Sequence, residues 1–225
     1  MRGNGPLEGE VKIQGSKNAA LPMMAAAVLH EGRTVLHNCP RIADVFEMEA
    51  ILQSMGVKTG WSGHTLVLDC NKICETDIPG EETRTMRSSI LLLGSMLGRC
   101  RRIRIGYPGG CVIGKRPIDY HLDVLRSMGA EILDDGGMLI AKAKKLYGTT
   151  FRFPYPSVGA TENAVMAAVL ATGTTKLVNC AKEPEVAELC GFLRSMGAKI
   201  SGERTGIITV DGVEKLFPTN HVTAG

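Results

Sequence analysis

The tripeptide Ser-Met-Gly occurs three times along the chain, and this repetition limits the folds that the chain can adopt. Its methionines are Met55, Met128 and Met196, so the copies lie 73 and 68 residues apart. Self-similarity at a nearly fixed period is typical of a domain made of repeated units. With 225 residues, 44% of them hydrophobic, three such units are enough for one large core.

A second similarity places an insertion in the middle unit. The segment from Leu29 to Cys39 matches the segment from Leu170 to Cys180, and a diverged copy ends at Gly106. Sixteen residues separate the end of this segment from the Met-Gly mark in the outer units, whereas the middle unit needs twenty-two. The extra residues fall in the stretch 107–117, which reads Tyr-Pro-Gly-Gly-Cys-Val-Ile-Gly-Lys-Arg-Pro. A loop added to a rigid repeated scaffold is a common place for function.

The apolar patterns predict two kinds of helix in each unit. One kind is apolar on nearly every side, which predicts burial, at 19–30, 86–97 and 163–171. The other kind has a single apolar stripe, which predicts half exposure, at 43–55, 118–128 and 185–196. Strands and two-stranded ribbons complete each unit. We therefore expect a mixed α/β (α+β) domain over 15–225, with three β-α-β-α-β-β repeats whose small sheets surround the buried helices.

Composition argues against several classes of protein. The net charge is only +3 and the Lys and Arg residues are scattered, so we expect no nucleic-acid partner. The apolar runs at 19–29 and 90–97 are too short to cross a bilayer, and residues 1–10 do not resemble a signal peptide. We expect a cytoplasmic protein without a membrane partner. Its seven cysteines should then be reduced, with Cys39 and Cys180 buried and structural.

Polar residues cluster where the three buried helices begin. If the units are related by approximate threefold symmetry, these helix N-termini share one end of the domain, and that end carries positive partial charge. Lys17, Asn18, Arg87 and Ser157 lie there. Cations at helix N-termini are misplaced unless an anion sits beside them, which predicts a phosphate or carboxylate site. The alternative is that these cations reach solvent or pair with an acid such as Glu81 or Glu82.

Cys111 differs from the other cysteines. It follows two glycines in the inserted loop, close to Lys115 and Arg116, an electropositive setting that favours the thiolate. Cys70 and Cys74 lack a second pair of metal ligands, and we expect no metal site.

Four separated motifs together resemble the UDP-N-acetylglucosamine enolpyruvyl transferase family. They are 15–22 (Gly-Ser-Lys-Asn-Ala-Ala-Leu-Pro), 85–89 (Thr-Met-Arg-Ser-Ser), 108–121 (Pro-Gly-Gly-Cys through His) and 157–161 (Ser-Val-Gly-Ala-Thr). The resemblance implies an inside-out α/β barrel and no cofactor. It also implies that the enolpyruvyl group of phosphoenolpyruvate moves to the 3-hydroxyl of UDP-N-acetylglucosamine, the first committed step of peptidoglycan synthesis.

The resemblance also implies roles for individual residues. Cys111 matches the family's loop cysteine, a general acid that can add covalently to phosphoenolpyruvate. Lys17 and Arg116 match cations that hold the phosphoenolpyruvate anion, and Asn18 belongs to the same region. The residues that match substrate-binding positions are Arg87, Arg116, Pro117, Ile118, Asp119, Tyr120, Tyr155, Ser157, Val158 and Gly159. Tyr155 stands where many family members carry a lysine, and Leu91 replaces a common aromatic residue.

The resemblance covers this whole chain but only about the first half of that enzyme. A second domain of similar build follows in the family, and it supplies the aspartate proposed to deprotonate the sugar hydroxyl. Residues 1–14 resemble a segment that packs with that second domain, which this chain lacks. We expect the chain to fold alone, to bind ligand weakly, and to turn over slowly or not at all, because catalysis needs both walls of the cleft.

Two other interpretations remain open. A 5-enolpyruvylshikimate-3-phosphate synthase would share the architecture and phosphoenolpyruvate, but it lacks the Gly-Gly-Cys loop. A non-catalytic module would keep the anion site to bind a nucleotide sugar or another anion. The presence of Lys17, Cys111 and Arg116 favours retained chemistry over such a module.

Overall fold

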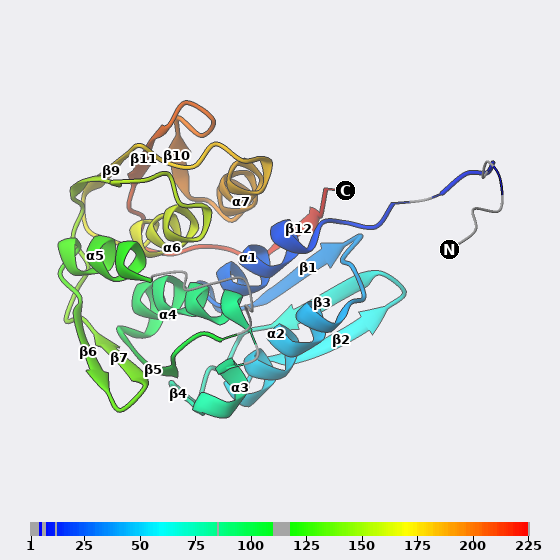
Figure 1. Cartoon of the computed structure of the whole chain (residues 1–225), viewed down its shortest axis with the longest axis horizontal. Coiled ribbons are helices and arrows are strands. Elements are labelled where there is room, and N and C mark those ends of the chain that lie inside the picture. The colour runs from blue at the N-terminus through cyan, green and yellow to red at the C-terminus, as the bar shows by residue number, and fades with distance from the viewer. Residues whose placement is uncertain (1–4, 6–7, 12, 85, 110–117, 225) are drawn as a thin grey trace.

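The fold is described from a computed structural model, which covers residues 5, 8–11, 13–84, 86–109 and 118–224. Three four-stranded sheets lie around a group of helices (Figure 1). The sheets, each in spatial order, are β12 (Thr219–Val222), β1 (Arg33–His37), β3 (Thr65–Asp69) and β2 (Lys58–Ser62); β4 (Asp77–Ile78), β5 (Arg102–Gly106), β7 (Met138–Lys142) and β6 (Glu131–Asp135); β8 (Thr150–Arg152), β9 (Thr174–Val178), β11 (Ile207–Asp211) and β10 (Lys199–Ser201).

The three sheets share one topology. In each, the first two strands pair in parallel and the remaining neighbours pair antiparallel. The predicted three-unit α/β fold is therefore confirmed. Within the described ranges the sheets stay separate, so the strands do not form one closed barrel.

The first sheet departs from the predicted order along the chain. A strand was expected before the first buried helix, but residues 8–11 and 13–16 contain none. The parallel edge of β1 is instead occupied by β12, which pairs Thr34 with Thr219 and His37 with Val222. An open parallel edge leaves backbone groups unpaired, and the last segment of the third unit satisfies them. The first and third units are thereby joined within one sheet.

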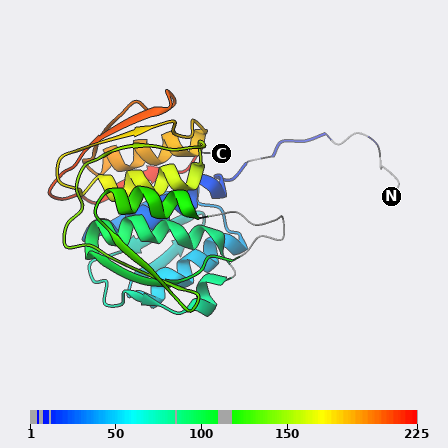
Figure 2. The ribbon, with the colours of Figure 1, turned by 60° about the vertical axis from the view of Figure 1, so that its left-hand side comes forward.

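The predicted burial of one helix in each unit is confirmed. The helices are α1 (Lys17–Ala27), α2 (Ala43–Ser54), α3 (Gly80–Arg84), the 3-10 helix η1 (Arg87–Leu91), α4 (Leu92–Cys100), α5 (Asp119–Ser127), α6 (Val158–Ala168) and α7 (Pro184–Ser195). Nearly every residue of α1, α4 and α6 after the first turn is buried, whereas α2, α5 and α7 bury one face. In Figure 2, α4, α5 and α6 lie side by side with nearly parallel axes.

The Ser-Met-Gly mark is a helix end repeated three times. Gly56, Gly129 and Gly197 follow α2, α5 and α7 with φ of 99°, 97° and 99°. This left-handed conformation is one that glycine adopts without strain, and it ends the helix. Met55, Met128 and Met196 precede these glycines and are fully buried. The repeated tripeptide thus corresponds to the same helix C-cap and the same buried methionine in all three units.

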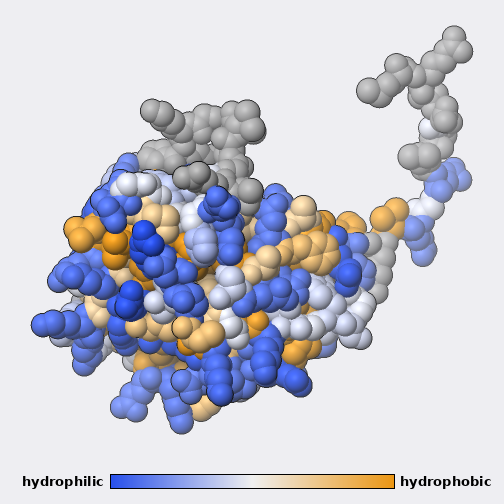
Figure 3. All heavy atoms as spheres, turned by 90° about the horizontal axis from the view of Figure 1, so that it is seen from below, coloured by the Kyte–Doolittle hydropathy of each residue, from blue (hydrophilic) through white to orange (hydrophobic). Residues whose placement is uncertain are grey.

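The surface of the molecule is mixed in character. Figure 3 shows hydrophilic residues spread over one face among smaller hydrophobic areas. Among the described residues, no helix has both the length and the apolar character needed to cross a membrane.

Candidate functional site

A cavity of about 760 Å³ lies at the end of the domain where the buried helices begin. That volume suits a small organic ligand. Its walls come from the first turns of α1, η1, α5 and α6 and from the start of α7. The predicted convergence of helix N-termini is therefore present, and their partial positive charges face one space. The site residues named from sequence that line the cavity are Asn18, Arg87, Tyr120, Tyr155, Ser157, Val158 and Gly159.

The start of α6 is shaped by a serine cap. The Oγ of Ser157 accepts a hydrogen bond from the backbone N–H of Ala160 at 3.4 Å, and the carbonyl of Ser157 accepts one from Thr161. The backbone N–H groups of Val158 and Gly159 precede the first intrahelical bonds and lie in residues that line the cavity. This first turn therefore offers backbone donors to an anion.

The start of α1 contributes an acceptor as well as donors. The Oγ of Ser16 accepts from the backbone N–H of Asn18 at 3.2 Å. Pro22 lies inside α1 and has no N–H, so the carbonyl of Asn18 lacks its usual helical donor. Both Asn18 and Pro22 line the cavity. This wall can therefore accept a hydrogen bond from a ligand hydroxyl or amide.

Arg87 supplies positive charge to the cavity. It is half buried at the first position of η1. His121 on α5 lies in the same wall and is 5% exposed. Burial, together with the charge of Arg87, lowers the pKa of His121 to about 3. The imidazole is therefore neutral at physiological pH, and Arg87 is the cationic group of this wall.

Three carboxyl groups also line the cavity, those of Glu162, Glu183 and Glu185. Glu162 on α6 is 3% exposed, and its Oε1 has no hydrogen-bond partner among the described residues. Burial, and then the charges of Glu185 and Glu183, raise the pKa of Glu162 well above its usual range. A carboxyl group in this state holds its proton and can donate to a ligand.

The other residues predicted from sequence lie next to the cavity or outside the described chain. Lys17 immediately precedes Asn18, but its Nζ forms a 2.6 Å ion pair with Asp44 on α2 and does not line the cavity. Its partner is thus neither Glu81 nor Glu82. Ile118 is buried as the N-cap of α5, and Asp119 is exposed in the first turn.

The inserted loop falls largely outside the described residues. Cys111, Arg116 and Pro117 all belong to the undescribed range 110–117. The described chain resumes at Ile118, two residues before Tyr120 in the cavity wall. The roles expected of these three residues remain predictions.

Two of the other cysteines, Cys39 and Cys180, behave as structural residues. Cys39 and Cys180 are buried, as predicted, and burial raises their thiol pKa values to about 12 and about 11. A thiol with such a pKa carries almost no thiolate at neutral pH. Each follows an asparagine with positive φ whose Nδ2 donates to a carbonyl just beyond the neighbouring parallel strand, from Asn38 to Thr223 and from Asn179 to Phe153.

The sequence did not identify every residue of the cavity. Glu162, Glu183 and Glu185 were not predicted as site residues, and His121 was named only as the last residue of the 108–121 motif. A usable signal was present for Glu162, because a glutamate at the start of an otherwise apolar helix has to be explained by a partner or a pocket.

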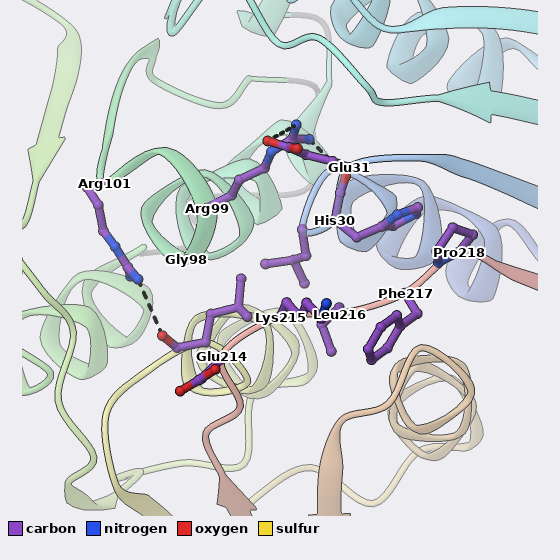
Figure 4. A pocket seen from close by; sticks show the side chains of 12 residues that line it. His30, Glu31, Gly98, Arg99, Arg101, Glu214, Lys215, Leu216, Phe217 and Pro218 are labelled. Carbon is purple, nitrogen blue, oxygen red and sulfur yellow. Dashed lines mark hydrogen bonds and ion pairs between the residues drawn. The ribbon is translucent and has the colours of Figure 1, made fainter.

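A second cavity, of about 430 Å³, lies at the opposite end of the buried helices (Figure 4). There Arg99 donates to the carbonyls of Val28 and His30, and Arg101 donates to the carbonyls of Leu97 and Leu170. These arginines satisfy carbonyls at the C-terminal ends of α1, α4 and α6. The two arginines thus cap the helix ends at this cavity, and the cavity at the N-terminal ends is the better candidate for ligand binding.

Comparison with known proteins shows which family this chain resembles. A family model described as EPSP synthase (3-phosphoshikimate 1-carboxyvinyltransferase) matches residues 1–225. UDP-N-acetylglucosamine 1-carboxyvinyltransferase 2 of Caldanaerobacter subterraneus subsp. tengcongensis is 45% identical over 221 residues, covering 98% of this chain and 53% of that protein. UDP-N-acetylglucosamine 1-carboxyvinyltransferase 1 of Symbiobacterium thermophilum is 47% identical, covering 96% of this chain and 50% of that protein. The chain therefore spans about half the length of these relatives.

Solved structures share the fold. The enolpyruvyl transferase NikO from Streptomyces tendae aligns with a TM-score of 0.86 at 22% identity, covering 98% of this chain and 53% of that one. EPSP synthase from Acinetobacter baumannii aligns with a TM-score of 0.76 at 21% identity, covering 96% and 49%. The resemblance inferred from the four motifs is confirmed by the named relatives, and the fold class by these structures.

Proposed function

Because this chain belongs to the EPSP synthase (3-phosphoshikimate 1-carboxyvinyltransferase) family, we propose that it is an enolpyruvyl transferase whose cavity holds UDP-N-acetylglucosamine. The observation that carries the proposal is that the starts of α1, η1, α5 and α6 meet around one cavity, which Arg87 also lines. Preorganised backbone donors and a fixed cation favour a diphosphate there. The names of the 45–47% identical relatives support this substrate over other anions.

In the proposed reaction, the sugar 3-hydroxyl gives its proton to a general base and its oxygen bonds to C2 of phosphoenolpyruvate, while the double-bond electrons take up a proton at C3. The resulting tetrahedral intermediate then loses phosphate from C2 and a proton from C3, which restores the C2–C3 double bond and gives the enol ether product. Cys111 is the proposed general acid at C3, and Lys17 and Arg116 are the proposed partners of the phosphoenolpyruvate anion. Oxidation states do not change in this substitution, so the proposal assigns no cofactor. The setting we propose is peptidoglycan synthesis in the cytoplasm.

Within the cavity, we propose a binding role for the residues of each wall. Ser157, Val158 and Gly159 at the start of α6 hold the diphosphate, and Arg87 adds charge to it. Tyr120 and the neighbouring Ile118 and Asp119 hold the uridine. Turnover would need a second wall that closes over the cavity and excludes water, so we propose that this chain alone binds substrate more readily than it converts it.

Isothermal titration of the chain with UDP-N-acetylglucosamine and, separately, with 3-phosphoshikimate tests the binding claim. Arg87→Ala should weaken UDP-N-acetylglucosamine about 10- to 100-fold, as expected when a hydrogen bond to a charged group is lost. The control, Arg102→Ala, removes an exposed arginine on β5 outside the cavity and should leave the affinity unchanged. Tighter binding of 3-phosphoshikimate, or equal effects of both substitutions, would contradict the proposal.

The covalent chemistry has its own test. Intact mass measurement after incubation with phosphoenolpyruvate should reveal an adduct of that compound's full mass, because the thiol S–H adds across its double bond. The Cys111→Ser chain should show none. An adduct that persists in Cys111→Ser would remove Cys111 from the proposed role.

A further inference from the structure

The side chain of Asn163 occupies an unusual position between three helices. It lies fully buried on α6. Its Oδ1 accepts a 2.6 Å hydrogen bond from the backbone N–H of Gly94, and its Nδ2 donates to the carbonyl of Ile90 at 2.9 Å. Ile90 and Gly94 are four residues apart, the spacing that a regular α-helix joins directly. The carboxamide of Asn163 therefore bridges the junction between η1 and α4.

This bridge allows only one orientation of the carboxamide. Rotated by half a turn, it would set NH2 against the N–H of Gly94 and oxygen against the carbonyl of Ile90. Both contacts would be repulsive and buried, and a buried polar group without a partner costs about 1–3 kcal/mol. The nitrogen of Asn163 consequently faces Ile90, and with it His121, whose Nδ1 lies 3.0 Å from Nδ2.

The orientation of Asn163 in turn determines where His121 carries its proton. Because Nδ2 of Asn163 can only donate, Nδ1 of His121 must accept. A neutral imidazole that accepts at Nδ1 is protonated at Nε2. The low pKa that burial and Arg87 give this ring is consistent with a neutral state.

The Nε2–H group of His121 is directed to the start of α6. A Cβ placed on Gly159 would lie 3.1 Å from Cε1 and 3.4 Å from Nε2 of the ring. Only a residue without a side chain leaves this approach open. The ring is 5% exposed and lines the cavity, and the hydrogen bond that the described residues give its nitrogens is the one at Nδ1. As far as the described residues show, this oriented donor has no acceptor, and it stands beside Gly159 in the first turn of α6.

We propose that Asn163 is a positioning residue, which holds His121 in the Nε2–H tautomer so that the ring donates to an oxygen of the ligand's diphosphate. The inference rests on the proposed function for the identity of the ligand, but the tautomer rests only on the contacts above. A neutral donor suits this place, because a second buried cation beside Arg87 would be costly to desolvate. Recognition of the diphosphate would then depend on α4, α5 and α6 being packed together.

Nitrogen-15 NMR of the histidine ring of the full chain, with and without UDP-N-acetylglucosamine, tests the proposal. Free chain should show His121 protonated at Nε2 and unchanged between pH 6 and 8, and the ligand should shift its Nε2–H signal. In Asn163→Asp the carboxylate can only accept, so the proton should move to Nδ1 or the ring should become charged. A free chain with the proton at Nδ1, or an equal mixture of tautomers, would overturn the proposal without any variant having to fold.

Two substitutions of His121 separate the donor from the packing. Gln places its amide nitrogen near the position of Nε2, whereas Asn reaches only the position of Nδ1. His121→Asn should weaken UDP-N-acetylglucosamine about 10- to 100-fold, as for a lost bond to a charged group, and His121→Gln should recover most of that loss. Equal affinity in the unaltered chain and His121→Asn would refute the donor role. If the unaltered chain does not bind UDP-N-acetylglucosamine, the proposed function fails, while the tautomer measurement still decides the role of Asn163.

Discussion

Gly94 and Gly98 lie one turn apart on α4, and replacing Gly94 with alanine should destabilise the fold far more than replacing Gly98. A Cβ on Gly94 would overlap both the backbone oxygen and the Oδ1 of Asn163, which the bridge holds in place. A Cβ on Gly98 would meet Cδ2 of Leu29 at 2.9 Å, and that methyl belongs to a side chain that can rotate away. The comparison therefore isolates the close approach of α4 and α6.

The magnitudes follow from three contributions. Replacing a helical glycine with alanine raises the free energy of unfolding by about 1 kcal/mol at both positions, because alanine has the higher helix propensity. At Gly94, overpacking costs about 1–3 kcal/mol and the disrupted bridge leaves buried polar groups unpaired, at about 1–3 kcal/mol. We expect Gly94→Ala to lower the free energy of unfolding by about 3 kcal/mol. Gly98→Ala should change it by less than about 1 kcal/mol, because the gain in propensity offsets a small repacking cost.

Urea and thermal unfolding followed by far-ultraviolet circular dichroism measure both variants. For a domain of this size, the loss in Gly94→Ala corresponds to a fall in Tm of about 6–12 °C. The same variant should also disturb the ring signals of His121, since its partner Asn163 has to move. If Gly94→Ala proves as stable as Gly98→Ala, the bridge does not fix the spacing of α4 and α6, and the reasoning is refuted.

Three further predictions concern the cavity. Glu162 has a folded-state pKa well above its unfolded value of 4.5, so its contribution to stability is lost progressively as pH rises above that value. In urea unfolding at increasing pH, Glu162→Gln should therefore lose less stability than the unaltered chain, and a parallel loss would contradict the buried acid. Ser157→Ala removes the cap of α6 and should cost about 1 kcal/mol of unfolding free energy, with weaker UDP-N-acetylglucosamine binding by titration. Tyr155→Lys adds a cation at an exposed position of the wall and should strengthen that binding about fivefold at low salt, an effect that 1 M salt should abolish.

Repetition made the fold predictable. Met55, Met128 and Met196 mark helix ends in three units. The helices that are apolar on all sides had to be buried, because they have no polar face to present to water. The pairing of β12 with β1 could not be predicted in the same way. It joins Thr34 to Thr219, and a local pattern does not specify which distant strand completes an open edge.

The site was only partly predictable for a related reason. Helix starts are readable locally, so Asn18, Arg87 and Ser157 could be placed around one anion site. The pairing of Lys17 with Asp44 depends on how α1 and α2 pack, and the protonation of His121 depends on a contact with α6. Such contacts between units are properties of the packed core, which motif spacing does not encode.

A crystal structure of the chain with UDP-N-acetylglucosamine would test the central claim most directly. We expect the diphosphate to lie in the cavity at the start of α6, with its oxygens about 3 Å from the backbone nitrogens of Val158 and Gly159 and from Nε2 of His121. A nucleotide bound instead at the opposite end of the helices, beside Arg99 and Arg101, or a diphosphate turned away from α6, would contradict it.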